Sequence, residues 1–325
     1  MRIQPIDFGR PGALLTGLYD VFAPAYAKDD PGPVMSGRRF AHEVSTGGSG
    51  ARAEAWVIAE DGEVTGGYGL SFPESGNTHM AWLFPLVVRP EAQGRGLGTA
   101  LFDHAVERMR ANGRRLLLSE SPVTGVGARF ARARGMTVSL ALARRVLDLR
   151  KVDWSAFERM RPDVPGYHLR SWTGPAPDEL LPTLATLMSG MNDAPRDSDL
   201  ADDSFDVARM REHERNLTLS GRTGHTTIAL RDSDGAPAGL TRINFDADRS
   251  SGWAGQSDTT VLREHRGRRL GLLLKLANAI RLHEHEPHLE RVITWNATVN
   301  AHMLAVNEAM GFELLDEWNE WRLEV

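Results

Sequence analysis

The sequence contains no cysteine, which excludes disulfide bonds, thiolate metal ligands and a cysteine nucleophile. Its main apolar run, AWLFPLVV, is far shorter than the roughly 20 residues of a membrane-spanning helix. The first residues, MRIQPIDFGRPG, lack the apolar core of a signal peptide. A formal net charge of −5 argues against nucleic acid or an anionic membrane as the main partner. These absences predict a cytoplasmic protein.

What is present is a chain of 325 residues, 41% hydrophobic and 25% charged, which is the composition of a globular protein too long for one core. The stretch VVRPEAQGRGLGTAL, residues 87–101, recurs as TVLREHRGRRLGLLL, residues 260–274. Gly94 matches Gly267 and Gly98 matches Gly271, so the same interval separates the members of both pairs. The chain therefore contains an internal repeat.

Each copy of the repeat has the same order of expected elements. A short strand and a helical region come first, followed by two strands joined at an Asp-Gly turn, which is a strong hairpin signal. The glycine-rich loop, a helix, an apolar strand, a closing helix and terminal strands follow. We expect a first module at residues 1–150, a helical linker at 151–164 and a second module at 165–325.

The glycine-rich loops predict anion binding. Backbone N–H groups that converge at a helix N-terminus bind phosphates, and glycine allows the required positive φ. The dinucleotide pattern GxGxxG fails because Thr99 stands where the third glycine belongs. The nucleotide pattern GxxxxGK[ST] fails in both copies.

The pattern that remains is [QR]-x-x-G-x-[GA], which Gln93, Gly96 and Gly98 match. With the strand order around it, the sequence resembles the GNAT superfamily of acetyl-coenzyme A-dependent acetyltransferases over nearly its whole length. TWNATVNAHMLAVNEAMGF and MNDAPRDSDL further resemble two-module acetyltransferases common in actinobacteria. The resemblance implies an α+β fold of two tandem GNAT modules. Each would be a mixed, mostly antiparallel sheet with flanking helices.

The resemblance also implies acetyl-CoA as the cofactor. In the family the glycine loop and helix N-terminus hold the pyrophosphate, and the preceding strand leaves its neighbour to pair with the pantetheine arm. By this resemblance the expected coenzyme-binding residues are Val88, Gln93, Gly94, Arg95, Gly96 and Gly98 in the first module, and Val261, Arg263, Arg266, Gly267, Arg268, Arg269, Gly271 and Asn300 in the second.

The second loop departs from the pattern, because Arg269 replaces the glycine found at Gly96. An arginine there either crowds the pyrophosphate or adds charge-assisted hydrogen bonds to it. Several arginines around a helix start oppose the helix dipole, and an anionic ligand relieves that conflict. We therefore favour binding.

Chemistry is expected in the second module. The strand before the first loop, MAWLFPLVV, offers only apolar side chains and a proline, whereas WAGQSDTTV offers Gln256 and Asp258 at period two, on one face. GNAT enzymes often place a general base on this strand, which makes Asp258 the candidate. The alternative is that the Asp258 carboxylate ties down a neighbouring loop.

Asn296, Asn300 and Asn307 complete the expected site. The family often has an asparagine near Asn296 and Asn300 that contacts pantetheine or caps the next helix. Many members carry a tyrosine acid four residues before the closing glycine, but Ala131 and Asn307 stand there. We expect Asp258, Asn296 and Asn307 to be catalytic, with Asn307 or water assisting the leaving thiolate, and we expect no metal.

An acidic run is the candidate acceptor site: Asp193, Asp197, Asp199, Asp202, Asp203 and Asp206. Such a run is either a solvated loop or an acidic mouth for a cationic amine. The expected partner is a small-molecule amine, with neither nucleic acid nor membrane bound, in a monomer or homodimer. Two alternatives stay open. One is catalysis in the first module through Glu120, and the other is a non-catalytic coenzyme or ligand sensor.

Overall fold

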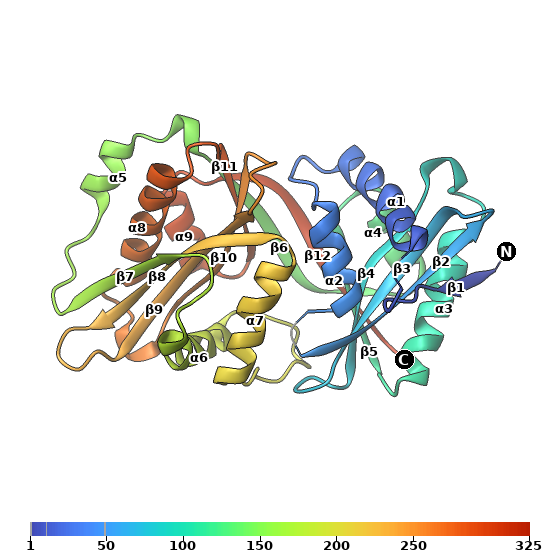
Figure 1. The fold of residues 1–325 in the computed structure, drawn as a ribbon, viewed down its shortest axis with the longest axis horizontal. Helices are drawn as coiled ribbons and strands as arrows, with labels where there is room; N and C mark the ends of the chain where they lie inside the picture. The colour runs from blue at the N-terminus through green and yellow to red at the C-terminus, as the bar shows by residue number, and fades with distance from the viewer. Residues whose placement is uncertain (1, 11, 49) are drawn as a thin grey trace. The chain divides into compact units, whose positions relative to one another are not determined.

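A computed structural model describes residues 2–10, 12–48 and 50–325 (Figure 1). The chain forms two compact units. The first unit comprises Met1–Leu140, Asp197–Ala201 and Trp318–Val325, and the second comprises Ala141–Arg196 and Asp202–Glu317. No helix of the described ranges combines the length and the apolar character needed to cross a membrane.

The first unit is a sheet flanked by helices. Its strand order is β1-β2-β3-β4-β5-β12, in which β4 and β5 are parallel and the other neighbours are antiparallel. Its elements are β1 (Ile3–Pro5), α1 (Ala13–Asp29), α2 (Gly37–Thr46), β2 (Ala51–Glu60), β3 (Glu63–Pro73), β4 (Met80–Val88), the 3₁₀ turn η1 (Pro90–Ala92), α3 (Leu97–Ala111), β5 (Leu116–Pro122) and α4 (Gly125–Ala133).

The second unit repeats this plan, with the order β7-β8-β9-β10-β11-β6 and one parallel pair, β10 and β11. Its elements are η2 (Leu149–Lys151), α5 (Trp154–Met160), β7 (Tyr167–Thr173), η3 (Asp178–Leu180), α6 (Leu181–Ser189), η4 (Gly190–Asp193), α7 (Val207–Leu219), β8 (Arg222–Arg231), β9 (Pro237–Asp246), β10 (Trp253–Val261), η5 (Arg263–His265), α8 (Leu270–His285), β11 (Arg291–Ala297) and α9 (Ala301–Ala309). The expected α+β class, with mixed and mostly antiparallel sheets, is confirmed.

The last strand of each sheet comes from the other copy of the repeat. β12 (Glu313–Glu324), at the end of the chain, pairs through Trp318–Glu324 with β5 of the first unit. β6 (Thr137–Asp148), at the end of the first copy, pairs through Leu142–Asp148 with β11 of the second unit. The modules 1–150 and 165–325 describe the repeated sequence, and the compact units cut across them.

Helices cover both faces of the first sheet (Figure 1). Adjacent residues of a strand point to opposite faces. Val57 packs with Leu18 of α1 and Phe40 of α2, while its neighbour Ile58 packs with Leu101 of α3. Helices α1 and α2 therefore cover one face, and α3 covers the other.

The second sheet follows the same rule. Ile228 of β8 packs with Leu184 of α6 and Met210 of α7. The next residue, Ala229, packs with Leu273 and Leu274 of α8 on the opposite face. In each unit the helix that follows the glycine loop thus lies on one face, and the first helices of the repeat lie on the other.

Candidate functional site

The two parallel strands at the centre of each sheet separate part of the way along. β4 pairs with β5 only from Met80–Trp82 to Leu116–Leu118. β10 pairs with β11 only from Trp253–Gln256 to Arg291–Thr294. Beyond these pairs each sheet has a gap, which opens toward the glycine loop that follows β4 or β10. The expected parting of the strand before the loop is thus present in both units.

A β-bulge lies at the start of each gap. In β4 the register shifts between the pairs Leu70–Leu83 and Tyr68–Leu86, and in β10 it shifts between Gln256 and Thr259. A bulge bends the strand and redirects the side chains next to it. The bulge of β10 contains Asp258, whereas the equivalent position of β4 in the repeat is Pro85.

Asp258 and its neighbour Gln256 have different environments. Gln256 is buried, and its Nε2 donates to the Arg242 carbonyl (2.7 Å) and to Thr241 Oγ1 (3.1 Å). Because of the bulge, Arg242 has no partner residue in β10, and the Gln256 side chain supplies a hydrogen bond to its carbonyl. Asp258 is partly exposed, and within the described ranges no hydrogen bond or ion pair holds its carboxylate. We expected the side chains of Gln256 and Asp258 to share a face of the sheet because residues two apart in a strand point the same way. The bulge interrupts this alternation between Gln256 and Thr259.

His213 of α7 is a candidate that sequence reasoning missed. Burial is the largest cause of its lowered pKa, the Arg242 guanidinium lowers it further, and the Asp258 carboxylate opposes both effects. The nearby Glu214 is buried and forms a 2.6 Å ion pair with Arg242. A lowered pKa keeps the His213 imidazole neutral near neutral pH, so it is available to accept a proton.

The first glycine loop has an open anion-binding geometry. Gly94 and Gly96 have φ values of 76° and 81°, and a Cβ on either would meet nothing within 4 Å. Gly96 is the N-cap of α3, whose first N–H groups have no partner inside the helix. Gln93 Nε2 donates to the Val88 carbonyl at 3.2 Å, so this side chain closes the loop onto the end of β4. Arg95 is exposed, and Gly98 lies in the first helical turn.

The second loop keeps the same backbone despite its arginines. Gly267 has φ 78°, and Arg269, the N-cap of α8, has φ 61°. Arg266 Nε donates to the Val261 carbonyl at 2.8 Å, which repeats the contact between Gln93 and Val88. Arg268 donates to the Glu264 carbonyl at 2.8 Å, and Gly271 lies in the first turn of α8. The helix start is therefore preserved, with a non-glycine residue in the left-handed region.

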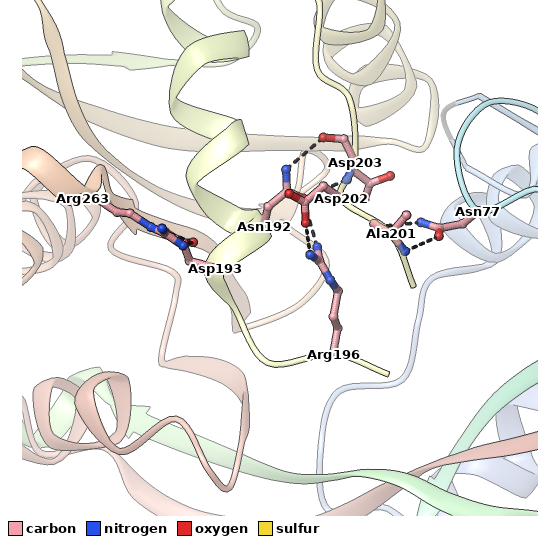
Figure 2. A network of polar contacts seen from close by, with 8 residues as sticks. All are labelled: Asn77, Asn192, Asp193, Arg196, Ala201, Asp202, Asp203 and Arg263. Carbon is pink, nitrogen blue, oxygen red and sulfur yellow. Dashed lines mark hydrogen bonds and ion pairs between the residues drawn. The ribbon is translucent and has the colours of Figure 1, made fainter. Parts of the chain in front are cut away.

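Asp193 engages two of the arginines expected to bind the coenzyme. Arg263 contacts both Asp193 carboxylate oxygens, with Nε 3.1 Å from each (Figure 2). Arg266 Nη2 lies 2.5 Å from Asp193 Oδ2. The hydrogen bond from Arg263 is the main cause that lowers the pKa of Asp193 to about 2. The carboxylate therefore neutralises charge that an anionic ligand would otherwise meet.

The rest of the acidic run is also engaged. Arg322 pairs with Asp197 and Asp199, Arg196 pairs with Asp202, and Arg209 pairs with Asp203 at 3.3 Å. Asp206 caps α7 by accepting from the Arg209 N–H at 2.7 Å.

Two asparagine side chains bind the backbone of the loop that carries the acidic run, each through both its oxygen and its nitrogen atom. Asn192 binds the backbone N–H and carbonyl of Asp203, and Asn77 binds those of Ala201 (Figure 2). The loop is thus built from paired groups, and its carboxylates are not free for a cationic acceptor.

The asparagines of the second module form part of a buried chain of hydrogen bonds. Asn307 is 0% exposed, its Nδ2 donates to Asn296 Oδ1 at 2.7 Å, and its Oδ1 accepts from Lys275 Nζ at 2.7 Å. Asn307 therefore lies behind Asn296 and does not face the gap itself. Asn300 caps α9 by accepting from the Met303 N–H at 3.3 Å. Lys275 is a second residue that sequence reasoning missed, because a single lysine within an apolar helix gives no signal of burial.

Two carboxylates of the first unit lie past the point where β5 stops pairing with β4. Glu120 of β5 is exposed, and Glu320 of β12 lies opposite it in the strand register. Burial is the largest cause that raises the pKa of Glu320. No proximity in the sequence could have indicated this pair, because Glu120 lies in the first copy of the repeat and Glu320 in the second.

Comparisons with known proteins agree with this geometry. The model of the "Acetyltransferase (GNAT) family" matches residues 17–135. A solved tandem GNAT protein from the clavulanic acid biosynthesis pathway, determined without AcCoA, is 30% identical, with a TM-score of 0.83. The match covers 99% of this chain and 98% of that one. No curated protein matches the sequence.

Two more distant structures share the fold alone. A GCN5-related N-acetyltransferase from Sphaerobacter thermophilus is 16% identical, with a TM-score of 0.66, over 99% of this chain and 95% of its own. A putative acetyltransferase from Pyrococcus horikoshii is 15% identical, with a TM-score of 0.58, over 100% of this chain and 89% of its own.

Proposed function

Because the chain belongs to the GNAT acetyltransferase family, with two modules in tandem, we propose that it is an N-acetyltransferase that uses acetyl-CoA and acts through its second module. The observation that carries this proposal is the Asp258 carboxylate, which lies in the bulge beside the gap and is held by no other group of the described ranges. Its first-module equivalent, Pro85, has no side chain that can take a proton.

Both loops have features that fit a coenzyme pyrophosphate. The glycines give an open cradle at the start of α3, and Arg269 adds a cation at the start of α8. Val88 and Val261, at the ends of the strands that border the gaps, are proposed to lie along the pantetheine arm. When bound, acetyl-CoA supplies the acetyl group as a thioester.

Asp258 is assigned the role of general base. An aliphatic amine is protonated at neutral pH and becomes a nucleophile only after it loses a proton. Asp258 takes up the amine proton, directly or through a water molecule, as the new N–C bond forms. The C–S bond then breaks, and coenzyme A leaves as a thiolate that takes a proton from water. The neutral imidazole of His213, whose pKa responds to the Asp258 carboxylate, is a second proton acceptor.

The proposed acceptor is a small amine that arrives as a cation. The acidic run does not support this choice, because its carboxylates are already paired. The support comes from Asp258, whose negative charge is left to meet the ammonium group.

Formation of an acetylated amine from acetyl-CoA and a panel of amines tests the proposal. We expect Asp258→Asn to lower kcat by about 100-fold or more, the usual contribution of a positioned base, with little change in KM for acetyl-CoA. Ser257→Ala, a change in the same bulge, is the matched control and should leave kcat nearly unchanged. A chain that binds coenzyme but acetylates no amine of the panel would be a sensor, and the proposal would fail.

A further inference from the structure

Lys275 lies in an unusual place for a lysine. It belongs to the second turn of α8 and is 1% exposed. Its Nζ donates to Asn307 Oδ1 at 2.7 Å and lies 4.9 Å from the centre of the Phe312 ring. Burial lowers the pKa of Lys275 to about 7, well below the ordinary value for a lysine.

The first module shows that the fold does not need this lysine. In the repeat its equivalent of Lys275 is Phe102, and its equivalent of Asn307 is Ala131. Phe102 packs edge-on against Phe130, with ring centroids 5.7 Å apart, in an apolar core. A buried amine costs stability that an aromatic ring at the same position does not. A role in the site of the second module accounts for this difference.

The hydrogen bonds of Lys275 define the orientation of two amides. An ammonium group only donates, so Asn307 must present its Oδ1 to Lys275. Asn307 Nδ2 then faces away and donates to Asn296 Oδ1, at 2.7 Å. Because Asn296 Oδ1 accepts this hydrogen bond, the N–H₂ group of Asn296 remains available as a donor to another group.

Asn296 borders the gap. It follows Thr294, the last residue of β11 that pairs with β10, by two positions, and it still pairs with Ala143 of β6 on the other edge. Asn296 is partly exposed, whereas Asn307 and Lys275 are buried. The chain of hydrogen bonds therefore runs from the core to the edge of the gap.

We propose that Lys275 is a positioning residue, which acts through Asn307 to present the Asn296 N–H₂ as a hydrogen-bond donor to a carbonyl oxygen of the acyl-pantetheine arm in the gap. This inference rests on the proposed function of the second module. A neutral lysine amine has a lone pair, so it can accept a hydrogen bond from Asn307 as well as donate one. Once Lys275 loses its proton, the side-chain amides of Asn307 and Asn296 are therefore free to exchange the positions of their oxygen and nitrogen atoms.

The test combines single and double variants of the full chain. We expect Lys275→Met and Asn296→Ala each to lower kcat/KM for acetyl-CoA about tenfold, the effect of losing one hydrogen bond. Because Lys275 acts only through Asn296, the double variant should be no worse than Asn296→Ala alone. Losses that multiply would overturn the proposal. Lys275→Phe, the residue of the first module, repeats the test if the methionine variant folds poorly.

A readout without substrate separates this inference from the proposed function. In the wild type the Asn307 side-chain amide protons should exchange slowly with solvent, as measured by NMR. Lys275→Met should speed up this exchange, and Asp258→Asn should not. Unchanged exchange in Lys275→Met would overturn the positioning role.

If Asp258→Asn keeps full turnover, the proposed function has failed, and acetyl-CoA affinity then decides the inference. Equal weakening of acetyl-CoA binding by Asn296→Ala and Lys275→Met would support it, and unchanged binding would overturn it.

Discussion

Lys275 should titrate near neutral pH and make the stability of the second unit depend on pH. Its pKa in the folded chain is about 7, against an ordinary value of 10.5. Between these values the unfolded chain holds a proton that the folded chain has lost, so the free energy of unfolding rises with pH. The gain approaches about 1.4 kcal/mol per pH unit, which amounts to about 2 kcal/mol between pH 7 and pH 9.

NMR of ¹³C-labelled lysine is the direct assay. The chain has three lysines, at positions 28, 151 and 275, so the signals can be assigned, and Lys275→Met identifies its own signal by removing it. Urea unfolding at pH 7 and pH 9 should show the gain in the wild type and not in Lys275→Met. A Lys275 signal that titrates above pH 10, or equal gains in both proteins, would mean that burial does not lower the pKa of Lys275.

Three further changes have defined outcomes. Asp193→Asn should strengthen coenzyme A binding in calorimetry by roughly threefold to tenfold, because Arg263 and Arg266 lose a competing carboxylate; weaker binding would mean that Asp193 orders the arginines instead. Arg269→Gly should raise the free energy of unfolding by about 1 kcal/mol by relieving a positive φ of 61°, and a loss would contradict this. Gln256→Leu should lower it by about 1 to 3 kcal/mol, because the Arg242 carbonyl loses its 2.7 Å partner; no change would refute this role.

Local chemistry made much of the fold predictable. Asp61 and Gly62 take positive φ values of 50° and 83° between β2 and β3, as the Asp-Gly turn predicted, and Gly235 takes 70° between β8 and β9. The glycine loops precede α3 and α8 as expected, because both the helical periodicity and the glycine positions are local signals.

Features that depend on distant contacts were not predictable. The exchange of β6 and β12 between the sheets depends on which strand edges meet, and the repeat alone does not encode this. The bulge at Asp258 required knowledge of the register between β9 and β10. The burial of Lys275 and the pairing of Asp193 depend on partners that lie far away in the sequence.

A comparison of two variants decides whether acetyl transfer takes place in the second module. The measurement is kcat/KM with one amine acceptor for Asp258→Asn and for Glu120→Gln, the carboxylate beside the gap of the first unit. We expect a fall of about 100-fold or more for Asp258→Asn and little change for Glu120→Gln. Loss of activity only in Glu120→Gln would contradict it and move the chemistry to the first module.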